Sequence, residues 1–212
     1  KAARRGTKYA FLIGDMPFGS YQVSKEEAIR NAIRFVKEAG CEAVKLEGGY
    51  DAVDATKAIV SAGIPVLGHI GLTPQTTSKL GGFKVQGKDA KAAKKLLDEA
   101  LSLERAGCFG IVLECVPDLV AKMITEKLAI PTISCGAGKY CDGQVIVTND
   151  LVGLFDRYTP KFVKKYVNLW PSILEGFKKY KDEVENGVFP DEAHSFTMKE
   201  EEFKKLKSKN RR

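Results

Sequence analysis

Two charged residues stand in a run that otherwise has the character of a buried strand. Lys45 and Glu47 alternate with Val44 and Leu46 in the stretch VKLEGG. Because successive side chains of a strand point to opposite faces, the two charged residues share one face and the two aliphatic residues share the other. A lysine and a carboxylate on one face of a strand either neutralise one another or bind a ligand.

Three more ionisable residues end similar apolar runs. Asp15 follows FLIG, His69 follows VLG and Glu114 follows GIVL. Any one of them alone is more often a helix cap, a loop residue or a satisfied core group. Burying isolated ionisable groups in five places would cost several kcal/mol each, so we expect the five to meet at one site.

The elements that would position these residues alternate along the chain. Apolar, β-branched runs end in Gly or a charged residue, and amphipathic stretches closed by Gly or Pro follow them. Ser24 is a predicted N-cap and Gly40 a predicted C-terminal end for the first helix. The strands are predicted at 9–18, 42–49, 65–72, 109–116, 131–138 and, least clearly, 143–150; the helices are predicted at 24–39, 51–63, 88–106 and 118–128.

Strands that alternate with helices predict parallel pairing through right-handed crossovers, hence an α/β fold. A doubly wound open sheet and a closed (β/α)8 barrel both fit this order. The placement of the ionisable residues near the C-terminal ends of strands favours the barrel, whose strand ends open on one mouth. The open sheet remains an alternative because the stretch GAGKYCDG (136–143) resembles a glycine-rich phosphate-binding loop. It lacks the full spacing of a dinucleotide-binding loop.

Composition and charge narrow the class of protein. The chain has 212 residues and a net charge of +7, but residues 1–8 and 198–212 carry +4 each, so the body between them is close to neutral. The basic ends are therefore expected to be solvated, with no nucleic-acid partner. No apolar run is long enough to span a bilayer, which predicts a soluble, cytoplasmic protein without a membrane partner. The five cysteines lack metal-ligand spacing and are expected to be reduced packing residues.

Seven motifs resemble, in order and approximate spacing, those of the ketopantoate hydroxymethyltransferase family. They are GDMPF (14–18), VKLEGG (44–49), GHIGLTPQ (68–75), GGFKVQG (81–87), LECVP (113–117), GAG…DGQ (136–144) and HSF (194–196). The resemblance implies a (β/α)8 TIM barrel that assembles as a homodecamer and uses Mg²⁺. It also implies transfer of a hydroxymethyl group from 5,10-methylenetetrahydrofolate to 3-methyl-2-oxobutanoate, giving 2-dehydropantoate for pantothenate and coenzyme A synthesis.

The resemblance also implies a role for each of the five residues. Asp15 matches a metal ligand that lies beside the substrate, and Glu47 matches a carboxylate of the metal site. Lys45 matches a substrate-binding lysine, and Glu114 matches the general base that removes a proton next to the carbonyl. His69 is expected to support the polar end of the substrate. No residue is assigned to the folate co-substrate.

The resemblance covers residues 1 to about 196, and six strands are predicted where a barrel of typically about 250 residues has eight. We therefore expect the first two βα units, with the family's Gly-Asp-Ser turn, to be absent from these 212 residues. Residues 1–197 are predicted to form the barrel domain and 198–212 a basic tail. The Gly- and Thr-rich segment 73–87 is predicted to be a lid.

Two other classes of protein remain open from the sequence. One is another Mg²⁺-dependent 2-oxo-acid lyase or mutase barrel, of the phosphoenolpyruvate mutase and isocitrate lyase group. The other is a non-catalytic interaction protein with basic ends.

Overall fold

The computed structural model describes residues 1–156 and 158–209 and separates into two compact units, Lys1–Ile146 and Val147–Arg212. The predicted domain boundary at residue 197 falls inside the second unit and stays a prediction. All five candidate residues belong to the first unit. No helix among the described residues is long and apolar enough to cross a bilayer.

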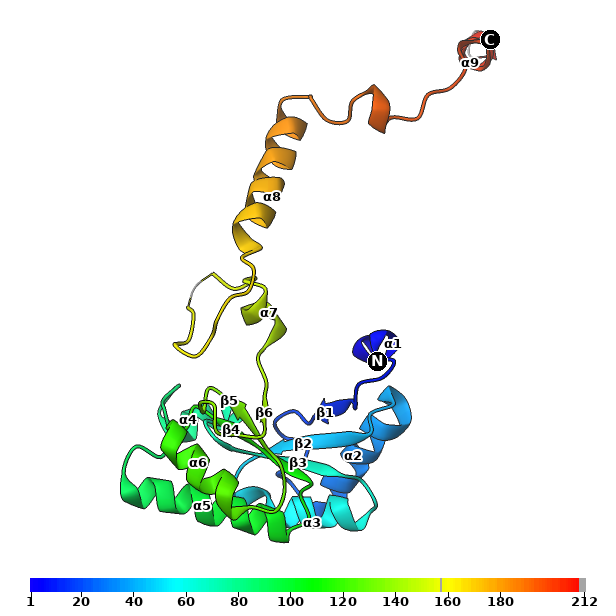
Figure 1. Ribbon diagram of the computed structural model, residues 1–212. Coiled ribbons are helices and arrows are strands. Elements are labelled where there is room, and N and C mark those ends of the chain that lie inside the picture. The colour runs from blue at the N-terminus through cyan, green and yellow to red at the C-terminus, as the bar shows by residue number, and fades with distance from the viewer. Residues whose placement is uncertain (157, 210–212) are drawn as a thin grey trace. The chain divides into compact units, whose positions relative to one another are not determined.

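The first unit is built on a parallel sheet in which the strands lie in chain order (Figure 1). This confirms the predicted α/β architecture. The strands are β1 (Ile13–Asp15), β2 (Ala43–Glu47), β3 (Val66–Gly71), β4 (Gly110–Glu114), β5 (Thr132–Cys135) and β6 (Gly143–Gln144). The last is shorter than predicted, and part of the expected strand 143–150 is instead the short helix α7 (Thr148–Leu151).

Helices link the strands and begin and end where the sequence indicates. In α2 (Lys25–Ala39) the Ser24 side chain accepts a hydrogen bond from the Glu27 amide, and Gly40 ends the helix in a left-handed conformation. Asp89 caps α5 (Ala90–Arg105) in the same way. The others in this unit are α1 (Ala2–Gly6), η1 (Tyr50–Ala52), α3 (Val53–Ser61), η2 (Pro74–Thr76), α4 (Thr77–Leu80) and α6 (Asp118–Lys127).

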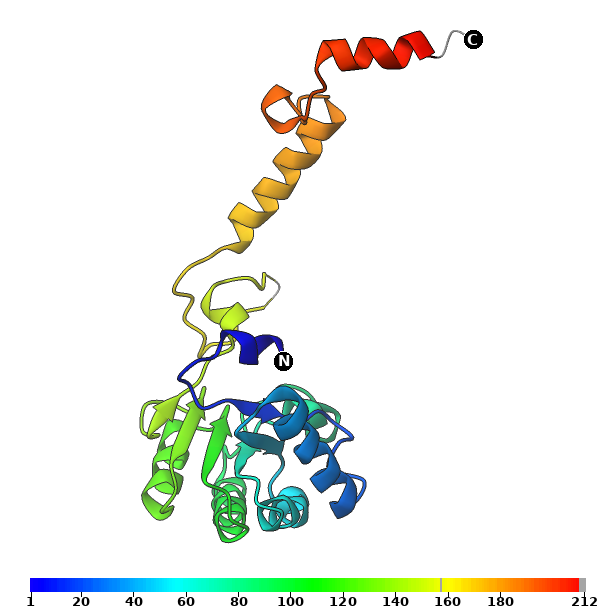
Figure 2. The ribbon, with the colours of Figure 1, turned by 90° about the vertical axis from the view of Figure 1, so that its right-hand side faces the viewer.

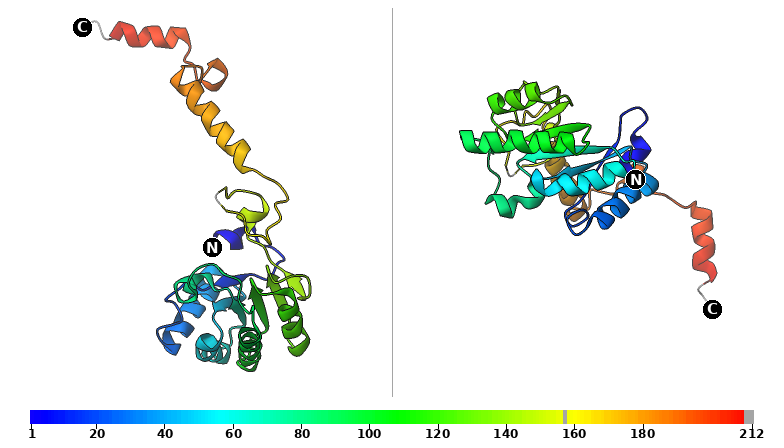
Figure 3. Two further views of the ribbon diagram at one scale, coloured as in Figure 1. Left: turned by 90° about the vertical axis from the view of Figure 1, so that its left-hand side faces the viewer. Right: turned by 90° about the horizontal axis from the view of Figure 1, so that it is seen from below.

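The helices α2, α3, α5 and α6 all lie on one face of the sheet (Figures 2 and 3). Val44 and Leu46 of β2 are fully buried in the core between the sheet and these helices, together with Ile59 of α3 and Leu103 of α5. The opposite face carries the smaller apolar cluster of Leu67, Val112 and Cys135. The predicted alternation in β2 is therefore confirmed, because its aliphatic residues face the helices.

The sheet accounts for six of the eight strands of the predicted barrel. Among the described residues, β1 and β6 each pair with a single neighbouring strand, so the sheet is open at both edges. Closure into an eight-stranded barrel stays a prediction.

The second unit contains helices and connecting segments. After α7 it has the 16-residue helix α8 (Trp170–Glu185), the single turn η3 (Glu192–His194) and α9 (Glu200–Lys209). None of the five candidate residues belongs to it.

Candidate active site

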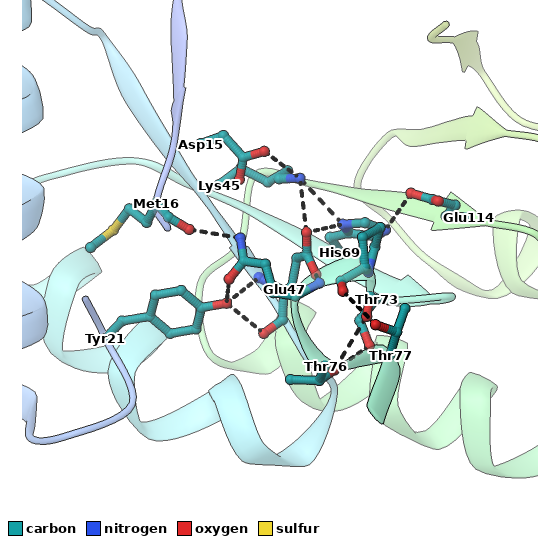
Figure 4. Close-up of polar contacts among 12 residues, drawn as sticks. Asp15, Met16, Tyr21, Lys45, Glu47, His69, Thr73, Thr76, Thr77 and Glu114 are labelled. Carbon is teal, nitrogen blue, oxygen red and sulfur yellow. Dashed lines mark hydrogen bonds and ion pairs between the residues drawn. The ribbon is translucent and has the colours of Figure 1, made fainter. Parts of the chain in front are cut away.

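Parallel strands bring the five candidate residues to one end of the sheet (Figure 4). The strand register places Asp15 beside Lys45, Glu47 beside His69, and Glu114 beside Gly71. Strand alternation puts all five on the face opposite the helices. The structure thus brings together every residue that the sequence singled out.

Lys45 is the centre of the charged group. Its Nζ lies 2.9 Å from Asp15 Oδ2, 3.6 Å from Glu47 Oε1 and 3.3 Å from His69 Nδ1. The Glu47 side chain is 4% exposed, and that of Asp15 is 58% exposed. The Lys45 ammonium therefore pairs with one buried carboxylate and one solvent-facing carboxylate. Its charge limits the free-energy cost of burying Glu47.

His69 connects Lys45 to Glu114. Its ring is buried, with Nδ1 facing the lysine and Nε2 lying 3.1 Å from Glu114 Oε2. An ammonium can only donate hydrogen bonds, so in the neutral imidazole Nδ1 accepts and Nε2 carries the proton. Nε2 lies near the Glu114 carboxylate but has no hydrogen-bond partner among the described residues.

Two residues that sequence reasoning missed hold Glu47 in place. The backbone N–H of Gln75 donates to Glu47 Oε2 at 3.0 Å. The Tyr21 hydroxyl lies 3.0 Å from the Glu47 backbone nitrogen and 3.1 Å from the Glu47 carbonyl oxygen. The same hydroxyl lies 3.0 Å from Gln75 Oε1, and Gln75 Nε2 donates to the Met16 carbonyl. Burial raises the pKa of Tyr21 to about 12, so its hydroxyl stays protonated at neutral pH.

The end of β4 has an unusual backbone. Cys115, directly after Glu114, has a φ of 49°, a conformation that residues other than glycine rarely adopt. Gly71 has a φ of 93°, and a Cβ on it would lie 2.2 Å from the Glu114 carbonyl oxygen. The Leu72 amide donates to that same oxygen at 2.8 Å. The ends of β3 and β4 are therefore in close backbone contact at Glu114.

A cavity of about 310 Å³ is lined in part by Glu47 and by residues of the segment predicted to be a lid. Its walls include Gly49, Lys79, Gly87 and Glu99. Within this segment Pro74–Thr76 and Thr77–Leu80 form single helical turns, and the Gln86 amide donates to the Cys115 carbonyl oxygen. The segment is therefore attached at both ends to the backbone around the site.

The metal-binding prediction concerns Asp15 and Glu47. Magnesium prefers hard oxygen ligands and is often held by one or two carboxylates, with water and substrate oxygens completing the octahedron. Two carboxylates that converge on one cation, here the Lys45 ammonium, supply suitable donors. Among the described residues no group of three or more His, Cys, Asp or Glu side chains is arranged to hold a metal. The metal role of these two residues stays a prediction.

Comparison with known proteins shows the family of the chain. The model of the ketopantoate hydroxymethyltransferase family matches residues 1–192. The chain belongs to the ketopantoate hydroxymethyltransferase family. The 3-methyl-2-oxobutanoate hydroxymethyltransferase of Syntrophomonas wolfei is 58% identical over 206 residues, which cover 97% of this chain and 75% of that protein. The enzyme of the same name from Syntrophobacter fumaroxidans is also 58% identical, over 97% of this chain and 73% of its own.

A solved structure supports the fold of this family member. Phosphonopyruvate hydrolase superposes with a TM-score of 0.50 at 10% sequence identity, covering 96% of this chain and 71% of the other. At that identity the likeness concerns the fold alone. It carries no argument for the lyase or mutase alternative, whereas the family match covers most of the chain.

Proposed function

We propose that this protein transfers a hydroxymethyl group from 5,10-methylenetetrahydrofolate to 3-methyl-2-oxobutanoate, forming 2-dehydropantoate. The observation that carries this proposal is the meeting of Asp15, Lys45, Glu47, His69 and Glu114 at one sheet end in a member of the ketopantoate hydroxymethyltransferase family. The names of the 58% identical relatives support the same acceptor substrate.

The substrate is a small anion, and Lys45 is the cation placed to receive it. The Lys45 side chain is 18% exposed and its ammonium pairs with the solvent-facing Asp15, so a carboxylate can approach from the open side. In a partly desolvated site a charge-assisted hydrogen bond is stronger than in water. Lys45 therefore binds the carboxylate end of 3-methyl-2-oxobutanoate.

Glu114 acts as the general base. The reaction requires removal of the C3 proton, next to the substrate carbonyl, so that the resulting enolate carbon can bond to the one-carbon unit. Glu114 has a 16% exposed side chain on the same face as Lys45, separated from it by the His69 ring. The Nε2–H group of His69 makes no hydrogen bond to the described part of the protein and is therefore available to support the polar end of the substrate.

Asp15 and Glu47 would hold Mg²⁺ through their carboxylate oxygens. When bound, the ion supplies Lewis-acid stabilisation of the enolate oxygen, so that the carboxylate of Glu114 suffices as the base. Segment 73–87 would cover the site and limit the access of water. A homodecameric assembly and a cytoplasmic location complete the proposal on family resemblance.

The proposal is tested by incubating the purified protein, fused to an N-terminal segment that supplies the two further βα units of the predicted barrel, with both substrates and Mg²⁺. Mass spectrometry should detect 2-dehydropantoate in amounts that depend on each substrate, and Lys45→Ala should form much less. A folded, Mg²⁺-supplied sample that forms no product would contradict it. Product formation from pyruvate-type substrates without a one-carbon donor would favour the lyase or mutase alternative.

A further inference from the structure

We infer that Tyr21 and Gln75 are positioning residues for Glu47. They fix its carboxylate so that Oε1 faces Lys45 and the bound 2-oxo acid, and they join segment 73–87 to the site. The proposed function is needed for the kinetic part of this inference, but not for its structural part.

The two oxygens of Glu47 have different surroundings. Oε2 receives the Gln75 amide at 3.0 Å, whereas Oε1 lies 3.6 Å from Lys45 Nζ and 3.8 Å from His69 Nδ1. Tilting the carboxylate away from this orientation would break its hydrogen bond to the Gln75 backbone N–H in a site where the Glu47 side chain is only 4% exposed. The Gln75 backbone N–H therefore fixes the orientation in which one carboxylate oxygen faces Lys45.

Both polar atoms of the Gln75 side chain have hydrogen-bond partners. Its Oε1 lies 3.0 Å from the Tyr21 hydroxyl, and its Nε2 donates to the Met16 carbonyl oxygen at 2.9 Å. The Tyr21 hydroxyl also accepts from the Glu47 amide. Tyr21 and Gln75 thus connect the links after β1 and β3 to the end of β2, where Glu47 lies.

If Tyr21 and Gln75 only stabilised the loops, a different result would be expected. Their removal would lower stability and reduce activity by the same factor whether or not Glu47 carries a carboxylate. A positioning role predicts instead that the kinetic effect depends on Glu47, because residues that act through one group show non-additive effects.

The kinetic test combines Tyr21→Phe and Gln75→Met, each alone and each together with Glu47→Gln. Alone, each should lower kcat/KM by on the order of 10-fold, the effect of losing one or two hydrogen bonds. In the Glu47→Gln background the further loss should be less than about twofold. Tyr140→Phe, which removes a hydroxyl from a different loop, is the matched control and should change nothing. An equal loss in both backgrounds would overturn the positioning role.

Hydrogen exchange provides a test that needs no turnover. In Tyr21→Phe and Gln75→Met the peptide containing the Gln75 amide should exchange on the order of 10-fold faster, because that hydrogen bond opens more often. A peptide from α6 should be unchanged in the same samples. Unaltered protection of the Gln75 amide would overturn the inference. A chain that forms no 2-dehydropantoate would contradict the proposed function and leave this measurement interpretable.

Discussion

Replacing Glu114 by Gln keeps the size of the side chain and an oxygen that can face His69 Nε2, now 3.1 Å away, but it removes the proton acceptor. Loss of a general base typically lowers turnover by about 10² to 10⁴, equivalent to about 2.7 to 5.4 kcal/mol of activation free energy. The substrate carboxylate is held by Lys45 in our proposal, so the Michaelis constant for 3-methyl-2-oxobutanoate should change less than about threefold.

Two assays separate proton removal from the rest of the reaction. NMR should follow exchange of the substrate C3 proton with deuterated water in the absence of the one-carbon donor, and mass spectrometry should follow 2-dehydropantoate. Both rates should fall together in Glu114→Gln. Glu126→Gln, which removes a carboxylate from a surface ion pair with Lys122, is the control and should be normal in both.

The charge of Glu114 can also be detected independently. The pKa of the Cys115 thiol is raised to about 11, first by burial and second by the neighbouring Glu114 charge. Alkylation of Cys115 should therefore reach its half-maximal rate at a lower pH in Glu114→Gln. Near-normal proton exchange in the variant, with Cys115 shifted as expected, would refute the assignment of Glu114 as the base.

The remaining predictions concern Lys45, Gly71 and Cys108. Lys45→Met should raise the Michaelis constant for the keto acid by roughly 10- to 100-fold, the worth of a hydrogen bond to a charged group, whereas Lys122→Met should leave it unchanged. An unaltered constant would make Lys45 structural. Gly71→Ala should cost more in urea-unfolding free energy than Gly63→Ala, because both have a positive φ, worth about 1–3 kcal/mol of strain, but only Gly71 would press a Cβ on Glu114. Equal costs would show that the β4 end moves aside freely. Burial raises the pKa of the Cys108 thiol from 9.0 to about 12, so the folded state holds this proton more tightly than the unfolded state. The resulting stability is present below pH 9 and lost as the pH rises toward 12, by at most about 4 kcal/mol. Urea unfolding should show this loss in the parent chain and a smaller one in Cys108→Ala; identical pH slopes would contradict it.

Local patterns were enough to predict most of the strands, the helices and the convergence of the five residues. The alternation around Lys45 fixes its face, and parallel pairing brings strand ends together without any knowledge of distances. The predicted strand 143–150 was wrong in part. Val145 and Val147 favour an extended backbone, but a strand also needs a neighbouring strand to pair with along its whole length. Barrel closure depends on strands that no local pattern in these residues supplies.

Tyr21 and Gln75 could not be found in the same way. Tyr21 lies in a link without periodicity, and its hydroxyl contacts residues 26 and 54 positions away. Such pairings follow from the tertiary fold, not from spacing along the chain. The only available signal for Gln75 was its place at the end of the GHIGLTPQ motif, next to a strand that ends in the site.

The separation of the two sheet faces has a consequence for mutational tolerance. In a saturation-mutagenesis map of β2, substitutions at Val44 and Leu46 should reduce the amount of folded protein, because these residues form the core with the helices. Substitutions at Lys45 and Glu47 should reduce activity, and those at Lys45 should also lower abundance because the buried Glu47 carboxylate loses its cation. On the same face, Leu67 and Val112 belong to the smaller apolar cluster, which is separate from the core that contacts the helices. A mutational map should therefore show two distinct sets of sensitive apolar positions, one for each face of the sheet.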